Sequence, residues 1–197
     1  MLKLVLFTIL TVPSAFANST VTNNVVILAL GDSLTAGYGL ARDDSIPRQL
    51  EKSLATSGYP VTVINAGVSG DTSAGGLARL EWAIAGNPQF VLVELGANDA
   101  LRGLDPVQTY DNLVQILVRL KKAGCRIVFA GMRAPRNLGL EYTLEFDQIY
   151  PNLAERHDLY FYPFFLEGVA TDPGLNQADG IHPNTEGVGV VVKGIQP

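Results

Sequence analysis

Short apolar runs alternate with amphipathic stretches along most of the chain. Runs of this kind predict strands buried on both faces, and they occur at residues 24–30, 61–64, 90–95, 126–130 and 159–161. Helical periodicity with start and stop signals such as Pro and Gly predicts helices between them. These helices are expected at residues 45–57, 72–85, 105–123 and 146–156, with a last one after Pro183.

Strands that alternate with helices indicate an α/β fold. Each strand-helix-strand unit favours parallel pairing, and the helices then cover both faces of the sheet. The sequence therefore predicts a five-stranded parallel sheet in a single domain over residues 18–197.

The first 17 residues have the layout of a secretory signal peptide. Lys3 precedes an apolar run from Leu4 to Val12, and small residues follow at Ala15 and Ala17. The run is shorter than the roughly 20 residues that span a bilayer. A buried first strand or helix is the alternative. Cleavage after Ala17 predicts an exported bacterial protein, periplasmic or secreted, without stable membrane insertion.

Composition narrows the chemistry. The 197 residues are 47% hydrophobic and 17% charged, which is typical of a folded chain. A net charge of −5 argues against a nucleic-acid partner, because such a surface would need to be basic. One Cys excludes an internal disulfide, and two His are too few for a His-rich dinuclear metal site.

Polar clusters follow the predicted strands. They read GDSLTAGYG at 31–39, NAGVSGDTS at 65–73, GAND at 96–99 and DGIHPN at 179–184. Ligand sites in parallel sheets lie at the carboxyl ends of the strands. The four clusters are therefore expected to form one site.

The residue types in these clusters suit nucleophilic catalysis. Asp179 lies three residues before His182, so that its carboxylate can orient the imidazole towards Ser33. Ser33, His182 and Asp179 would then be nucleophile, general base and orienting acid. The backbone amides of Ser33 and Gly70 and the side-chain amide of Asn98 would form the oxyanion hole.

The sequence also allows other interpretations. Ser69 in GVSGD lacks the last glycine of a nucleophile elbow, and His157 is expected at a helix end on the surface. A metallophosphoesterase would need more His ligands. A non-catalytic ligand-binding module on the same fold remains the alternative, although it needs neither nucleophile nor base. The aromatic residues are expected to pack internally; they are Trp82, Tyr38, Phe164 and Phe165.

The four ordered clusters resemble the blocks of the GDSL or SGNH hydrolases. The runs SGDTSAGGLARL (69–80) and VLVELGANDALRG (91–103) are similar to the bacterial acyl-CoA thioesterase, lysophospholipase and arylesterase subgroup. The resemblance implies a three-layer α/β/α sandwich of the flavodoxin-like type. It also implies hydrolysis of carboxylic esters or thioesters through an acyl-serine, with no metal or organic cofactor.

The substrate is expected to be a small-molecule ester or a lipid, bound by a monomer. Leu101, Leu104, Leu138 and Leu140 either line the acyl pocket or pack internally. The tail departs from the family pattern, because Gly187, Gly189 and Gly194 fall in the expected last helix. Each glycine costs about 1 kcal/mol relative to alanine, so a short or weak helix is predicted there.

Overall fold

A computed structural model describes residues 25–196. Five parallel strands form one sheet in the order β2-β1-β3-β4-β5. The strands are β1 (Val25–Gly31), β2 (Val61–Gly67), β3 (Phe90–Glu94), β4 (Arg126–Ala130) and β5 (Tyr160–Tyr162). The predicted fold class is thereby confirmed. The predicted export signal at residues 1–17 lies outside the described residues.

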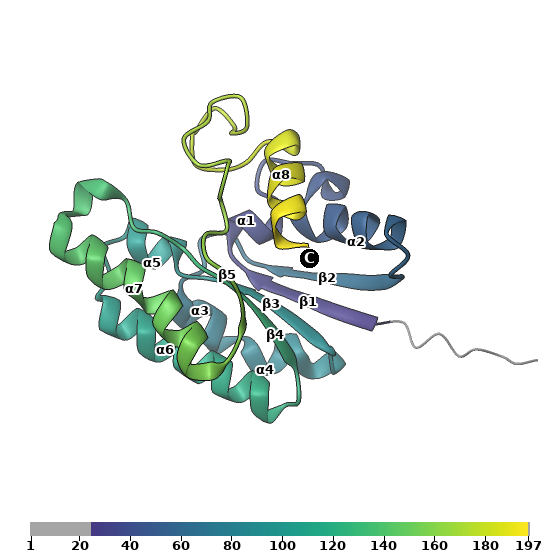
Figure 1. The fold of residues 1–197 in the computed structure, drawn as a ribbon, viewed down its shortest axis with the longest axis horizontal. Helices are drawn as coiled ribbons and strands as arrows, with labels where there is room; N and C mark the ends of the chain where they lie inside the picture. The colour runs from purple at the N-terminus through teal and green to yellow at the C-terminus, as the bar shows by residue number, and fades with distance from the viewer. Residues whose placement is uncertain (1–24, 197) are drawn as a thin grey trace, which may run out of the picture.

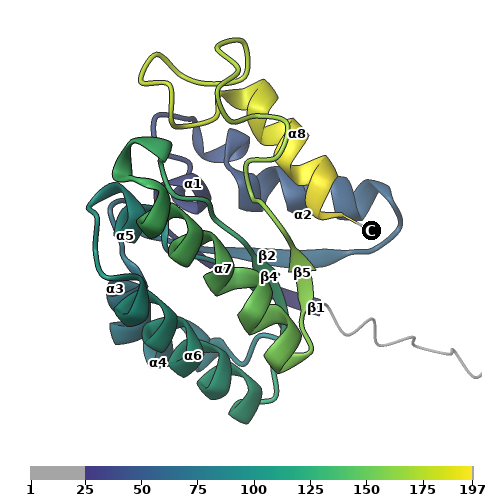
Figure 2. The same cartoon turned by 60° about the vertical axis from the view of Figure 1, so that its left-hand side comes forward.

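Two helical layers cover the sheet (Figures 1 and 2). One face carries α2 (Ile46–Thr56) and α8 (Thr185–Ile195), which pack against each other. The other face carries α3 (Ser73–Ala78), α6 (Pro106–Lys122) and α7 (Leu140–His157). The remaining elements are short: α1 (Ser33–Ala36), α4 (Leu80–Ala83), α5 (Ala97–Leu101), η1 (Arg42–Asp44), η2 (Ile84–Gly86) and η3 (Arg136–Leu138).

The interior strands β1 and β3 are largely apolar, since helices cover both of their faces. In β1 the last four residues are buried, and in β3 only Phe90 retains some exposure. Helix α6 adds a buried stripe at helical spacing, formed by Leu113, Ile116, Leu117 and Leu120. The packed layers hold the carboxyl ends of the strands in fixed positions, and the loops that follow these ends carry the polar clusters.

Helix α7 begins six residues earlier than predicted. The start expected at Phe146 is wrong, since the helix runs from Leu140 through Pro151 to His157. Thr143 is buried one turn before Phe146 and extends the same face. Its hydroxyl donates to the carbonyl oxygen of Gly139 at 2.9 Å. The added turn lacks a side-chain N-cap hydrogen bond, so the usual start signal is missing.

The single helix predicted over residues 72–85 is also wrong. The segment divides at Arg79 into α3 and α4 and ends in η2. The Arg79 side chain forms an ion pair with Asp71 at 2.6 Å and donates to the carbonyl oxygen of Gly31 at 2.9 Å. These contacts tie the division of the helix to the end of β1.

The last helix is complete despite its glycines. Asn184 caps it by accepting a hydrogen bond from the Gly187 amide at 2.9 Å. A Cβ atom at Gly187 would lie 2.1 Å from the carbonyl oxygen of Leu175, and one at Gly194 would lie 2.2 Å from the Tyr162 hydroxyl. Two of the glycines therefore allow close packing that a side chain would prevent. The helix spans 11 residues, so the expectation of a short helix is wrong.

Candidate active site

Three side chains from opposite ends of the chain form a hydrogen-bonded line. Ser33 begins α1 directly after β1, whereas His182 and Asp179 lie in the loop between β5 and α8. The Ser33 Oγ atom lies 2.8 Å from Nε2 of His182. The Nδ1 atom of His182 lies 2.7 Å from Oδ2 of Asp179. The structure thus brings together the three residues that the sequence singled out.

The Asp179 carboxylate is stabilised in its charged form. Its Oδ1 atom accepts hydrogen bonds from the amides of Ile181 at 3.0 Å and His182 at 3.1 Å. The Ile181 amide, followed by the His182 ring and amide, lowers the pKa of Asp179 to about 2. The carboxylate therefore remains ionised at neutral pH and can hold a proton on Nδ1 of the imidazole.

A tight turn presents the Ser33 hydroxyl. Asp32 caps α1, because its Oδ1 atom accepts from the Leu34 amide at 3.0 Å. Gly31 precedes it at a point without room for a side chain. A Cβ atom there would lie 2.1 Å from the Thr35 hydroxyl and 2.5 Å from the Glu94 carboxyl.

The three predicted oxyanion donors surround the same space. Gly70 lies in the turn after β2 with φ +84, and Asn98 lies in the first turn of α5. The Asn98 amide nitrogen donates to Oδ2 of Asp32 at 3.1 Å and to the carbonyl oxygen of Asp71 at 2.9 Å. Both N–H groups of Asn98 therefore have partners before any substrate binds.

A pair of buried carboxyl groups lies behind the turn. Burial raises the pKa of Asp32 to about 6. The pKa of Glu94, which is fully buried on β3, is raised well above its usual range by burial and then by the Asp32 charge. Glu94 accepts from the Thr35 hydroxyl at 2.7 Å and the Asp32 amide at 3.3 Å. Burial and the nearby Asp32 charge therefore favour the neutral form of Glu94 over its carboxylate.

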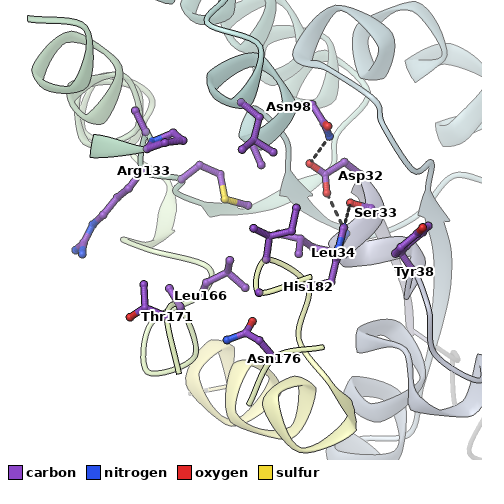
Figure 3. A pocket seen from close by; sticks show the side chains of 18 of the residues that line it. Asp32, Ser33, Leu34, Tyr38, Asn98, Arg133, Leu166, Thr171, Asn176 and His182 are labelled. Carbon is purple, nitrogen blue, oxygen red and sulfur yellow. Dashed lines mark hydrogen bonds between the residues drawn. The ribbon is translucent and has the colours of Figure 1, made fainter. Parts of the chain in front are cut away.

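An apolar cavity of about 630 Å³ opens beside Ser33 (Figure 3). This volume suits a small organic ligand. One wall follows β4 and the other belongs to the loop before α8; the apolar lining includes Leu101, Met132, Ala134, Pro135, Phe164, Leu166, Ala170 and Ile181. Ser33, Gly70, Asn98 and His182 lie on the lining as well. A substrate in the cavity would therefore meet apolar walls and the polar line together.

The sequence and the fold match known proteins. The pattern of the GDSL-like Lipase/Acylhydrolase family matches residues 29–190. The chain belongs to this family. It is 44% identical to an arylesterase of Vibrio mimicus over 161 residues, which is 81% of the chain and 80% of that protein.

Two further relatives of this GDSL-like protein support the assignment. The Thioesterase 1/protease 1/lysophospholipase L1 of Escherichia coli K12 is 44% identical, over 81% of the chain and 76% of that protein. The crystal structure of AlinE4, an SGNH-hydrolase family esterase, superposes with a TM-score of 0.77 and 49% identity. That superposition covers 86% of the chain and 92% of AlinE4.

One of the four leucines considered for the acyl pocket of this GDSL-like protein lines the cavity. Leu101 lines the cavity, whereas Leu104, Leu138 and Leu140 are not among its lining residues. Leu104 lies in the turn after α5, where its carbonyl oxygen accepts from the Tyr142 hydroxyl at 2.8 Å. Leu140 is 74% exposed at the start of α7. Of the four leucines, Leu101 is therefore the one that borders the cavity.

Tyr38 and Phe164 line the cavity, although internal packing is expected for both from the sequence. The Tyr38 ring lies 4.8 Å from the His182 ring, centroid to centroid, and Tyr38 is 55% exposed. Phe164 lines the cavity, while Phe165 is buried as expected. Trp82 is 79% exposed, so packing does not explain it either. Tyr38 belongs to the same GDSLTAGYG cluster as Ser33, and this proximity in sequence could have placed it at the site.

Ser69 and His157, the other serine and histidine considered from the sequence, do not form the hydrogen-bonded line. Ser69 lines the cavity, but Ser33 is the serine hydrogen-bonded to His182. His157 ends α7 and does not line the cavity. Across residues 25–196, no group of three or more His, Cys, Asp or Glu could hold a metal ion. In the same part of the chain, no helix is long and apolar enough to cross a bilayer.

Proposed function

We propose that this protein hydrolyses carboxylic esters through an acyl-serine formed on Ser33. The hydrogen-bonded line from Ser33 to His182 and Asp179, beside an apolar cavity, carries the proposal. The arylesterase and the thioesterase/lysophospholipase among its relatives support ester or thioester substrates. The acyl chain would occupy the apolar cavity next to Leu101.

The reaction follows from the positions of the groups. Nε2 of His182 takes the Ser33 proton as Oγ attacks the carbonyl carbon, and the Asp179 carboxylate stabilises the imidazolium. The amides of Ser33 and Gly70 and the Asn98 side chain stabilise the resulting oxyanion. Because both Asn98 N–H groups already have partners, one of them must turn from Asp32 or Asp71 to the substrate oxygen.

The covalent intermediate then breaks down. As the tetrahedral species collapses, His182 gives its proton to the leaving alkoxide, and the acyl group remains on Ser33. A water molecule next attacks the acyl carbon while His182 accepts its proton. The second collapse releases the carboxylic acid and returns the proton to Ser33.

The compartment would limit the natural substrate. If residues 1–17 direct export, cytosolic acyl-CoA is out of reach, and lysophospholipids or small environmental esters become the substrates. The mass of the protein recovered from the periplasm or medium of an expressing bacterium tests this. A mature chain beginning at Asn18 is expected, and full-length protein confined to the cytosol would contradict export.

A p-nitrophenyl ester series with wild type and Ser33→Ala tests the reaction. Loss of the nucleophile should lower kcat by at least about 10³-fold for every chain length. Ser57→Ala is the matched control, since Ser57 is exposed at the end of α2. If folded Ser33→Ala were as active as wild type, the proposed reaction would be wrong and a binding role would be favoured.

A further inference from the structure

The loop that carries the imidazole is anchored in the core by Phe165 and Val169, but its segment next to His182 is exposed. Residues 163–184 connect β5 to α8 without another helix or strand, and they project from the sheet in Figures 1 and 2. Asp179, Gly180 and Ile181 are exposed. His182 is nevertheless held within hydrogen-bond distance of Ser33, so contacts of the neighbouring residues must fix this exposed segment.

Gln177 provides contacts on both sides of this loop. Its backbone amide donates to the carbonyl oxygen of His182 at 2.8 Å. Its side-chain nitrogen donates to the carbonyl oxygen of Pro183 at 2.9 Å and to that of Tyr38 at 2.7 Å. The last bond joins residues 139 positions apart in the chain.

The amide orientation is determined by its surroundings. The side-chain nitrogen faces two carbonyl oxygens, which need donors, so the reversed amide would place three acceptors together. The Oε1 atom of Gln177 lies against Gly39, where a Cβ atom would approach it to 2.1 Å. Gly39 has φ +74, a conformation that favours glycine. Gly39 therefore leaves the space that the Gln177 amide occupies.

We propose that Gln177 is a positioning residue that sets the distance between the Ser33 hydroxyl and the His182 imidazole. One of the two segments runs from Ser33 through α1 to Tyr38, whose carbonyl oxygen accepts from Gln177. The other is His182 and Pro183, whose carbonyl oxygens also accept from Gln177. Gln177 connects these two segments with three hydrogen bonds. It does not line the cavity, so it acts on the rate of the chemical step and not on substrate binding.

This inference rests on the proposed acyl-serine reaction. The main test is Gln177→Met, which keeps the side-chain length and removes both side-chain donors. We expect kcat per active serine, counted by phosphonate titration, to fall by about 10- to 100-fold. KM for a short p-nitrophenyl ester should stay within about twofold, because the cavity is unchanged. Gln148→Met is the matched control on the exposed surface of α7.

A spectroscopic readout separates positioning from general stability. The proton between Nδ1 of His182 and Asp179 should give a low-field proton resonance in wild type and Gln148→Met. In Gln177→Met the looser loop should broaden or remove this resonance while the rest of the spectrum stays folded. An unchanged resonance together with wild-type kcat per serine would overturn the proposal.

A second variant approaches the same contact from the other side. Gly39→Ala places a Cβ against Gln177 and should lower kcat without a large change in KM. Gly124→Ala is its control, since Gly124 has φ +78 and nothing within 4 Å of the added Cβ. Equal activity of the two glycine variants would contradict the proposal. An active Ser33→Ala would contradict the proposed reaction itself. An inactive Ser33→Ala together with a fully active Gln177→Met would contradict only the positioning role of Gln177.

Discussion

The side-chain nitrogen of Asn98 lies 3.1 Å from Oδ2 of Asp32 and donates a hydrogen bond to it. A second bond reaches the carbonyl oxygen of Asp71. The donor proposed for the oxyanion is thus held in place from two sides before the reaction begins. These two bonds hold the amide at the site, and one of them must be exchanged for the substrate oxygen when the oxyanion forms.

Replacement of this donor should reduce the rate of the chemical step. We expect Asn98→Ala to lower kcat by about 10²- to 10³-fold, with a small change in KM. Steady-state kinetics on a short p-nitrophenyl ester measure both constants. Asn152→Ala, an exposed position on α7, is the control. A kcat within threefold of wild type would remove Asn98 from the oxyanion hole.

Asp32 should make folding stability depend on pH. Burial raises its pKa from 3.8 to about 6, so the folded protein binds this proton more tightly than the unfolded chain. The contribution to the free energy of unfolding therefore falls as pH rises from about 4 to about 6, and then levels off. Asp32→Asn should gain stability relative to wild type across this window. Urea unfolding at pH 4, 5, 6 and 7 measures the difference, with exposed Asp43→Asn as control; a constant difference for Asp32→Asn would contradict the assignment.

The two histidines should differ in their effect on activity. His182→Ala removes the base next to Ser33 and should lower kcat by at least about 10³-fold. His157→Ala should retain activity within about twofold, because His157 lies at the end of α7 away from the cavity. The p-nitrophenyl ester assay compares them directly. Comparable losses in both variants would argue against His182 as the single base.

Two glycines of α8 should respond in opposite directions to alanine. Gly187→Ala forces a Cβ against the Leu175 carbonyl and should destabilise the fold by about 1–3 kcal/mol. Gly189→Ala has its nearest neighbour at 3.6 Å and should stabilise the helix by up to about 1 kcal/mol. Urea unfolding at pH 7 gives both values. Shifts of the same sign would mean that close packing does not explain Gly187.

Leu101 should influence chain-length preference, whereas Leu104 should not. Leu101→Ala removes apolar surface from the cavity wall and should lower kcat/KM for long-chain esters by about three- to tenfold. The acetate ester should be much less affected. Leu104→Ala serves as the control because Leu104 does not line the cavity. Identical chain-length profiles for both variants would place the acyl chain elsewhere.

The strands and the site were predictable because their signals are local in sequence. Apolar runs such as residues 25–30 and 90–93 mark buried strands, and a parallel sheet brings the clusters that follow them to one edge. Ser33, Asn98 and His182 could therefore be grouped without coordinates. The hydrogen bonds from Asp179 through His182 to Ser33 could also be inferred from the spacing. The bonds of Asn98 to Asp32 and Asp71 could not, because they depend on how distant loops pack.

The missed features depend on contacts between segments that are distant in sequence. From the sequence, Glu94 is simply a polar residue at the end of a strand. The fold shows that its side chain is buried and accepts hydrogen bonds from Asp32 and Thr35. The extra turn of α7 is favoured by packing of Thr143 and not by a capping residue. Likewise, Gly187 weakens a helix in isolation, but the contact with Leu175 makes a side chain there unfavourable.

Ser33 and His182, the proposed nucleophile and base, lie 149 positions apart, with β2, β3, β4 and β5 between them in the chain. During synthesis, a growing chain exposes Ser33 long before His182 has been added. A chain that ends before residue 182 contains all five strand segments but lacks the imidazole that lies 2.8 Å from the Ser33 hydroxyl. Under the proposed reaction, the Ser33 hydroxyl gains its base only when one of the last segments of the chain has docked, so copies truncated before residue 182 should be inactive.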